Sequence, residues 1–338
     1  MTHARERERS GVAAFLVAMT LAVAATATAR AATPAALPAA RRAAEFPSEV
    51  MDEVVVTGER AGPGLWHIHR GGAHLWVLGT VSPLPKDMQW RSKQLEQVLD
   101  GADEVLVAKP FEVGFARVMW LLITQRDLLL VRGGKHLRDV LPANLYARFA
   151  LQRAKISRDP DKWERLRPII AIAFLQESAL HKVGLSTRLD LGTEVRALAR
   201  KHRVRVEEIE MAGLRDVLDA LRTVPTETEN TCVAASLSTI ESGLPRLVDR
   251  ARAWATGNVE LIQRLPETAE IDACRSALTG DAQAADLLAR IHRTWLAGFD
   301  ERLRHGGVTI AVVNMDLLLQ PGGLLDDLRA QGFEVDGP

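Results

Sequence analysis

Short apolar strand patterns alternate with longer helical patterns along most of the chain after residue 64. The runs Leu65 to Arg70 and Leu75 to Val81 are rich in β-branched, aromatic and aliphatic residues, and Gly71-Gly72 between them supplies the backbone freedom of a turn. The pattern predicts two strands folded on a short turn. The second strand runs into a Pro-rich loop at Gly79, and α/β proteins gather ligands at the carboxyl ends of such strands.

The same alternation continues to the end of the chain. Pro142 and Pro168 stand where proline opens a helix at its first position, and the chain from about Thr226 to His305 looks entirely helical. The expected helices are Arg91 to Leu99, Leu145 to Ala154, the segment after Pro168, Thr193 to His202, Asp286 to His305 and Gly322 to Ala330, and the further strands are Glu104 to Ala108, Val204 to Ile209, Val308 to Val313 and Phe333 to Val335.

Two parts of this layout match each other. Val77 to Val107 and Val308 to Val335 both run strand, loop, helix, strand. The pattern predicts an α/β (α+β) fold with a mixed central sheet built from these two units and a large helical insertion at about residues 112–305. If the first strands of the two units are neighbours, Ser82 and Asp316 occupy equivalent places at one edge of the sheet, which we call the rim.

The N-terminus has the features of an export signal. Arg5, Arg7 and Arg9 precede the uncharged run Gly11 to Ala29, and Ala29-Arg30-Ala31 fits a cleavage site. Residues 1–31 are therefore expected to be a signal peptide, with an uncleaved membrane anchor as the alternative. Residues 32–52 are Ala- and Pro-rich and fit a linker, so residues 53–338 form the expected domain, in the periplasm or secreted.

The composition argues against several other classes of protein. With 43 basic and 43 acidic residues and a single tyrosine, the chain has neither the charge nor the stacking residues expected of a nucleic-acid-binding protein. The apolar run Phe115 to Val131 is interrupted at Gln125, Arg126 and Asp127, which favours a buried helix over a membrane span. No membrane span is expected after signal cleavage.

The two cysteines, Cys232 and Cys274, both fall in the helical segment. An even count in an exported protein favours a disulfide. A loop of this length would stabilise the fold by about 3–4 kcal/mol through the unfolded state.

The order and spacing of several segments identify a family resemblance. They are the opening Leu-Trp strand with Leu78-Gly79-Thr80-Val81, Ala102 to Leu106, Val206 to Glu210, Arg290 in the last long helix, and the end from Val308 through Gly322-Gly323 to Val335. In these features, over roughly Leu65 to Val335, the chain resembles the TraB/GumN family, whose animal relatives are the Tiki membrane-associated metalloproteases.

The departures from the family pattern concern its metal site. Where the family has Gly-x-x-His after the first strand, this chain has Gly79-Thr80-Val81-Ser82, and the second Gly-x-x-His is replaced by Val313-Asn314-Met315-Asp316. The family Glu at the end of the next strand aligns with Ala108. A hydrolytic metal needs about three His or carboxylate ligands, and only Asp316 remains. Both motifs are therefore degenerate, and no intact catalytic residue is expected.

Other residues offer a rebuilt or remnant site. His67 and His69, two apart on a strand, point to one side and would form, with Asp316, an alternative metal site; an exposed polar face is the competing interpretation. As implied by the resemblance, Gly79, Asp190, Glu210 and Arg290 would line a remnant pocket, although Glu210 and Asp190 also fit ordinary surface acids and Arg290 fits a pairing with an acid.

Ser82 fails the requirements for a serine nucleophile. The segment lacks the Gly-x-Ser-x-Gly elbow, and Pro83 removes the next backbone N–H as an oxyanion donor. Lys86, four residues on, is the only base suggested by the sequence.

The sequence thus favours a non-catalytic TraB/GumN-like member, a pseudoenzyme with a binding or structural role in the cell envelope. Its expected partner is an envelope protein or a peptide, no nucleic acid is expected, and a homo-oligomer formed through the apolar helical segment is a third option. No cofactor is expected. The alternative is a metal-dependent hydrolase or peptidase with a relocated site for Zn, Mn or Co.

Overall fold

The computed structural model describes residues 62–86, 90–109, 120, 124–187, 191–265 and 269–338. The expected signal peptide and linker, and Asp190 of the expected remnant pocket, lie outside the described residues.

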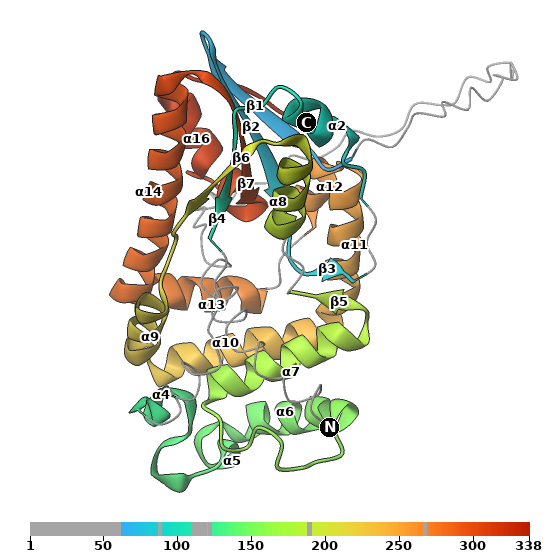
Figure 1. Cartoon of the computed structure of the whole chain (residues 1–338). Helices are drawn as coiled ribbons and strands as arrows, with labels where there is room; N and C mark the ends of the chain where they lie inside the picture. Colours follow the sequence, from blue (N-terminus) through green and yellow to red (C-terminus); the bar gives the residue numbers. More distant parts are fainter. Residues whose placement is uncertain (1–61, 87–89, 110–119, 121–123, 188–190, 266–268) are drawn as a thin grey trace, which may run out of the picture.

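A mixed six-stranded sheet forms one half of the molecule, in the order β6-β4-β7-β2-β1-β8 (Figure 1). The four neighbours β6, β4, β7 and β2 are parallel, whereas β1 is antiparallel to both β2 and β8. The strands are β1 (Leu65–Arg70), β2 (Ala73–Thr80), β4 (Glu104–Ala108), β6 (Arg205–Ile209), β7 (Gly307–Asn314) and β8 (Glu334–Asp336), and the short strands β3 (Leu84–Pro85) and β5 (Leu185–Ser186) pair in a separate sheet.

Helices cover both faces of the sheet and build the other half of the molecule. In Figure 1 the parallel strands point their carboxyl ends toward this helical half. The helices are α2 (Lys93–Leu99), α4 (Arg126–Leu129), η1 (Arg132–Gly134), α5 (Leu137–Val140), α6 (Ala143–Ile156), α7 (Pro168–Lys182), α8 (Leu191–His202), α9 (Leu214–Thr223), α10 (Thr226–Ser238), η2 (Thr239–Gly243), α11 (Leu244–Ala255), α12 (Val259–Arg264), α13 (Ala269–Thr279), α14 (Ala282–His305), α15 (Met315–Leu319) and α16 (Leu324–Ala330).

The alternation of side chains along each strand separates two cores. On one face, apolar residues of the sheet such as Ile68 and Ala311 pack with Trp295 and Phe299 of α14. On the other face, Ile310 and its neighbours pack with residues of α2 and α8. Because successive strand residues point to opposite faces, strands buried on both sides must be apolar throughout, as Val105 to Val107 and Ile310 to Val313 are.

The two strand-loop-helix-strand units are both formed, and they are interleaved. β2, α2 and β4 make the first, and β7, α16 and β8 make the second, with β7 inserted between β2 and β4. β2 and β7 pair in parallel with Thr80 opposite Asn314. Ser82 and Asp316 each follow two residues later, which puts the loop that carries Ser82 and the first turn of α15, which carries Asp316, side by side at the rim.

The segment between the two units forms a helical bundle and returns one strand to the sheet. α6, α7 and α10 share a core that includes Phe149, Ile172 and Val233, and β6 pairs with β4 as the Val204 to Ile209 pattern predicts. Within the expected helix at Phe115 to Val131, the described residues are helical at Trp120, at Thr124 and over α4 (Arg126–Leu129), with a non-helical Gln125 before α4. Leu130 is extended there and bridges to Leu166, so the helix ends before the apolar run does.

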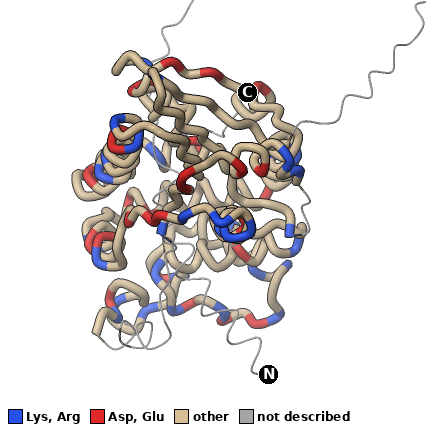
Figure 2. Tube along the Cα trace, turned by 45° about the horizontal axis from the view of Figure 1, so that its top comes forward, with Lys and Arg blue, Asp and Glu red and all other residues tan. Residues whose placement is uncertain are grey.

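The disulfide expected between Cys232 and Cys274 is present and joins α10 to α13. None of the described helices combines the length and the apolar character that crossing a membrane requires. Figure 2 shows basic and acidic residues interspersed along the helices and loops, in line with the balanced charge.

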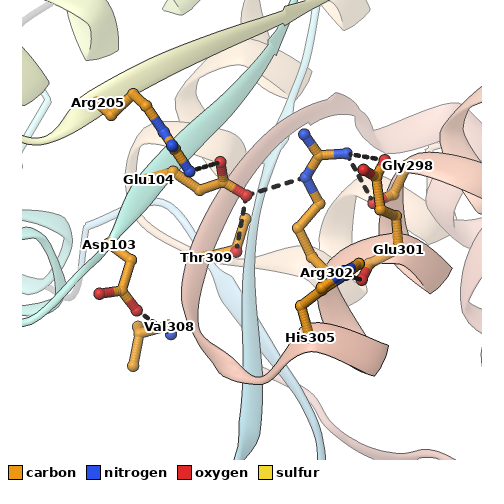
Figure 3. A network of polar contacts seen from close by, with 9 residues as sticks. All are labelled: Asp103, Glu104, Arg205, Gly298, Glu301, Arg302, His305, Val308 and Thr309. Atoms are coloured by element: carbon orange, nitrogen blue, oxygen red, sulfur yellow. Dashed lines mark hydrogen bonds and ion pairs between the residues drawn. The ribbon is translucent and has the colours of Figure 1, made fainter.

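A buried charge network stabilises the amino end of β4 (Figure 3). The Glu104 carboxylate accepts hydrogen bonds from Arg205 on β6 and Arg302 on α14, each at 2.9 Å. Thr309 of β7 also donates to Glu104, at 3.4 Å. Three strands and the longest described helix are therefore joined at the edge of the sheet opposite the rim.

Candidate functional site

The rim is formed by the carboxyl ends of the four parallel strands. Paired positions at or near these ends are Thr80 with Asn314, Val107 with Val312 and Ala108 with Ile209. The residues expected at a family-type site, Ser82, Ala108 and Asp316, therefore belong to adjacent strands and loops, as the sequence predicts.

Helix α11 closes one side of the rim with two side chains one turn apart, Arg250 and Trp254. Trp254 is fully buried, and its Nε1 donates a hydrogen bond to the backbone oxygen of Gly79 at 2.6 Å. Gly79 has no space for a side chain, because a Cβ there would lie 2.5 Å from the ring of Trp66. Gly79 is thus a packing position between tryptophans of α11 and β1.

Asp316 is held by the other of these α11 side chains, Arg250. Arg250 donates through Nη2 to Asp316 Oδ1. The Asn314 side chain accepts the backbone N–H of Asp316 at 2.7 Å and caps α15. Arg250 is largely buried, whereas the Asp316 side chain is 47% exposed, so the carboxylate faces solvent on one side and a guanidinium on the other.

A second guanidinium occupies the end of β4. Arg196 of α8 is buried and donates through Nη2 to the backbone oxygen of Ala108 at 2.6 Å. Its Nε donates to Glu208 at 3.1 Å. The position where the family pattern has a carboxylate therefore carries a methyl group beside an arginine.

Ser82 is exposed in the loop after β2. The base that the sequence suggested for it, Lys86, donates a hydrogen bond through Nζ to the backbone oxygen of His181 at 3.2 Å. Its ammonium group therefore binds α7 and acts as a donor there, which gives no support to a serine nucleophile.

The other residues of the expected remnant pocket are engaged in ion pairs. Glu210 is exposed and lies 3.8 Å from Lys109. Arg290 donates to Asp216 at 2.9 Å and also pairs with Asp286 at 3.1 Å. These contacts support the interpretation that Arg290 pairs with acids.

The Asp216 carboxylate also stabilises the start of α9 by accepting the backbone N–H of Gly213 at 2.8 Å. Burial acts to raise the pKa of Asp216, but the hydrogen bonds from Gly213 and Arg290 outweigh it, and the pKa lies below its usual value. The hydrogen bond to Asp216 raises the pKa of Arg290 in turn.

The residues at the rim do not fit a catalytic divalent metal. Such a site needs about three His or carboxylate ligands and an open position for water. The rim offers the hydroxyl of Ser82, the methyl group of Ala108 and the carboxylate of Asp316, which Arg250 already binds. Two guanidinium groups add positive charge where a cation would have to lie.

A second polar cluster lies on the hairpin that β1 and β2 form. It is on the same face of the sheet that α2 and α8 cover nearer the sheet centre. We call His67, His69, His74, Glu334 and Asp336 the hairpin cluster. In the register His69 lies opposite His74 on β2 and Glu334 on β8, and His67 lies opposite Asp336. Ligand atoms of His67, His69 and Asp336 all lie within 4.8 Å of one another. The carboxylate beside the histidine pair is thus Asp336, whereas Asp316, expected there, pairs with Arg250.

The three imidazoles of the hairpin cluster are stacked and hydrogen-bonded. His67 Nε2 lies 3.0 Å from His74 Nδ1, and the ring of His67 stacks on Trp76 with the centroids 4.2 Å apart. Burial lowers the pKa of His67, and His69 and His74 lower it further, against the opposing effect of Asp336. His67 therefore favours the neutral form.

Part of the hairpin cluster follows from the sequence alone. A two-residue turn at Gly71-Gly72 fixes the register that puts His69 opposite His74. This register connects His74 to the histidine pair, although His74 is absent from the alternative metal site that the sequence predicts. Glu334 and Asp336 could not be found in the same way, because their approach depends on β8 pairing with β1 across more than 260 residues.

Comparison with known proteins identifies one family. The model of the TraB/PrgY/gumN family matches residues 64–337, which covers the sheet, the rim and the helical segment together. No curated protein and no solved structure matches the chain.

Proposed function

The chain belongs to the TraB/PrgY/gumN family, and from this premise we propose that it is a non-catalytic member with a binding or structural role in the cell envelope. The observation that carries the proposal is the pairing of Arg250 with Asp316 at the position of the second family histidine. It replaces a metal ligand by a carboxylate that is paired with an arginine. At the family glutamate position Ala108 offers no side-chain ligand, and Arg196 donates to its backbone oxygen.

Export is part of this proposal. The predicted signal peptide at residues 1–31 supports it, and so does the disulfide between α10 and α13. Disulfides persist in oxidising compartments such as the periplasm and are rare in reducing ones. The proposed location is therefore periplasmic or secreted.

The rim is the proposed binding surface, with a peptide or a segment of an envelope protein as its ligand. Ser82 is exposed at its edge, and Asp316 faces solvent. Backbone N–H groups of a peptide can donate hydrogen bonds to the exposed Ser82 hydroxyl and to the Asp316 carboxylate.

A peptidase assay tests the non-catalytic part of the proposal. The tag-free full chain is incubated with a library of quenched fluorescent peptides in the presence of Zn²⁺, Mn²⁺ or Co²⁺. We expect no metal-stimulated hydrolysis and no difference between the parent chain and Asp316→Ala. Hydrolysis that Asp316→Ala abolishes would contradict the proposal.

The alternative of a relocated hydrolase site has one observation in its favour, the hairpin cluster. The same assay separates the two, because a hydrolase using that cluster would lose activity in His69→Ala and keep it in Asp316→Ala.

The binding part is tested by a photo-crosslinking residue at position 82 in cells that produce the chain. We expect a discrete crosslinked product from position 82. The matched control is position 215, whose arginine is 94% exposed on α9, and it should give none. Equal products from both positions, or none from either, would argue against a ligand at the rim.

A further inference from the structure

We propose that the hairpin cluster is a binding site for one Zn²⁺ ion, with His67, His69 and Asp336 as its protein ligands. The proposal concerns a different place from the rim and does not depend on the function proposed for it.

The two distances from the Asp336 carboxylate to the histidines are close to the spacing that a tetrahedral ion requires, and all three ligand atoms lie within 4.8 Å of one another. Tetrahedral bonds of about 2.0–2.1 Å put ligand atoms about 3.3 Å apart. Asp336 Oδ2 lies 3.1 Å from His69 Nε2 and 3.7 Å from His67 Nδ1. Small side-chain rotations are therefore enough to bring these atoms around a single ion.

The chemical type of the ligands selects the metal. Two imidazoles with one carboxylate suit Zn²⁺ and neighbouring divalent transition metals, whereas Mg²⁺ and Ca²⁺ prefer oxygen ligands. Glu334 Oε2 lies 3.8 Å from His69 Nε2 and can complete the coordination, or water can take that place. The acids are exposed, at 69% for Asp336 and 78% for Glu334, so an ion reaches the site from solvent.

His74 and Trp76 provide the surroundings that metal-bound histidines have. If His67 binds the ion through Nδ1, its Nε2–H donates to His74 Nδ1 at 3.0 Å, which fixes the tautomer and the orientation of the ring. Trp76 covers the face of the same ring. His74 is then a positioning residue, because it acts on the ion only through His67.

Binding at this site would join the last strand to the hairpin. β8 has three residues, and its ladder with β1 consists of three residue pairs. Since Asp336 lies on β8 and both histidines lie on β1, the ion adds a link between the two strands. The expected consequence is stronger protection of β8 from hydrogen exchange when Zn²⁺ is present.

The test is calorimetric titration of the tag-free full chain with Zn²⁺. We expect one ion per chain, with at least tenfold weaker binding in His69→Ala and Asp336→Ala. His292→Ala is the matched control, because His292 lies outside the cluster and pairs with Asp327 on α16; it should bind as the parent chain does. Circular dichroism establishes that each variant is folded.

Co²⁺ supplies an independent readout through its visible spectrum, which reports the ligand geometry. His74→Ala should weaken binding about tenfold and alter that spectrum, and His74→Gln, which keeps a hydrogen-bond acceptor, should restore both in part. Binding that survives in the double variant His67→Ala/His69→Ala would overturn the proposal. So would a parent chain that takes up neither Zn²⁺ nor Co²⁺.

Discussion

Removal of the Glu104 carboxylate is predicted to destabilise the fold by about 3 kcal/mol. Glu104 is 7% exposed at the start of β4 and is the shared acceptor for Arg205, Arg302 and Thr309 (Figure 3). In Glu104→Ala the guanidinium of Arg302, which is only 14% exposed, loses its buried counter-charge.

The size of this loss of stability depends on the interactions that each arginine retains when the Glu104 carboxylate is removed. Breaking a buried ion pair by removing one partner costs about 3–5 kcal/mol, because a buried charge is left without compensation. The lower end applies here, since Arg302 also donates to the Gly298 oxygen at 3.3 Å and to Glu301 at 2.8 Å. The Arg205 side chain is 70% exposed, so its pairing with the same carboxylate contributes about 0–1 kcal/mol.

Urea or guanidinium denaturation followed by circular dichroism measures both effects. Arg205→Ala is the matched control, because it removes the exposed partner of the same carboxylate. We expect Glu104→Ala to lower the denaturation midpoint strongly and Arg205→Ala to change it little, with the same dependence on denaturant. Equal losses in the two variants, or a loss below about 1 kcal/mol in Glu104→Ala, would refute the reasoning.

Three further predictions concern other parts of the fold. Reduction of the disulfide between α10 and α13, whose cysteines are 42 residues apart, should lower the free energy of unfolding by about 3–4 kcal/mol, measured by denaturation with and without reductant. Asp216→Asn should cost about 1 kcal/mol near neutral pH, because the amide keeps an acceptor for the Gly213 N–H but loses the charge that pairs with Arg290 and that favours the start of α9. Because the pKa of Asp216 is lowered in the fold, this stability is present above the pKa of the unfolded chain and is lost as the pH falls through the folded value; denaturation at a series of pH values should show the parent and variant converging in acid, and a constant difference would contradict the assignment. Gly79→Ala should destabilise by about 1–3 kcal/mol, seen as a lower melting temperature, since the new methyl group meets Trp66; an unchanged melting temperature would show that the tryptophan moves aside at no cost.

The strand-loop-helix-strand units could be predicted because their signals are local. Strand patterns such as Glu104 to Ala108 are apolar over nearly their whole length, and that strand is observed with the same bounds. The order of strands in the sheet is not a local property. Nothing in either unit indicates that β7 inserts between β2 and β4, since that position depends on packing between segments about 200 residues apart.

The candidate sites also combine features that local sequence predicts with features that depend on packing between distant segments. The rim residues Ser82 and Asp316 follow from matching the two units, and their strands are neighbours as that match requires. The partners that decide their chemistry, Arg250 and Arg196, lie on helices of the central segment. The sequence around an arginine on an amphipathic helix does not indicate which strand end its side chain contacts. The sequence alone therefore shows which metal ligands are missing, but not which residues take their place.

The two arginines lead to one more prediction, on restoring the family ligands. The triple variant Ser82→His/Ala108→Glu/Asp316→His carries the family residue types, yet Arg250 and Arg196 remain beside two of the new ligands. Two unit charges 4 Å apart near a protein surface interact by about 4 kcal/mol, and a divalent ion doubles that repulsion. In a His69→Ala background, which silences the hairpin cluster, we therefore expect the triple variant to bind Co²⁺ weakly, and added Arg250→Ala to strengthen binding about tenfold or more. Equal binding with and without Arg250 would show that the missing ligands alone, rather than the arginines that replaced them, determine the loss of the family site.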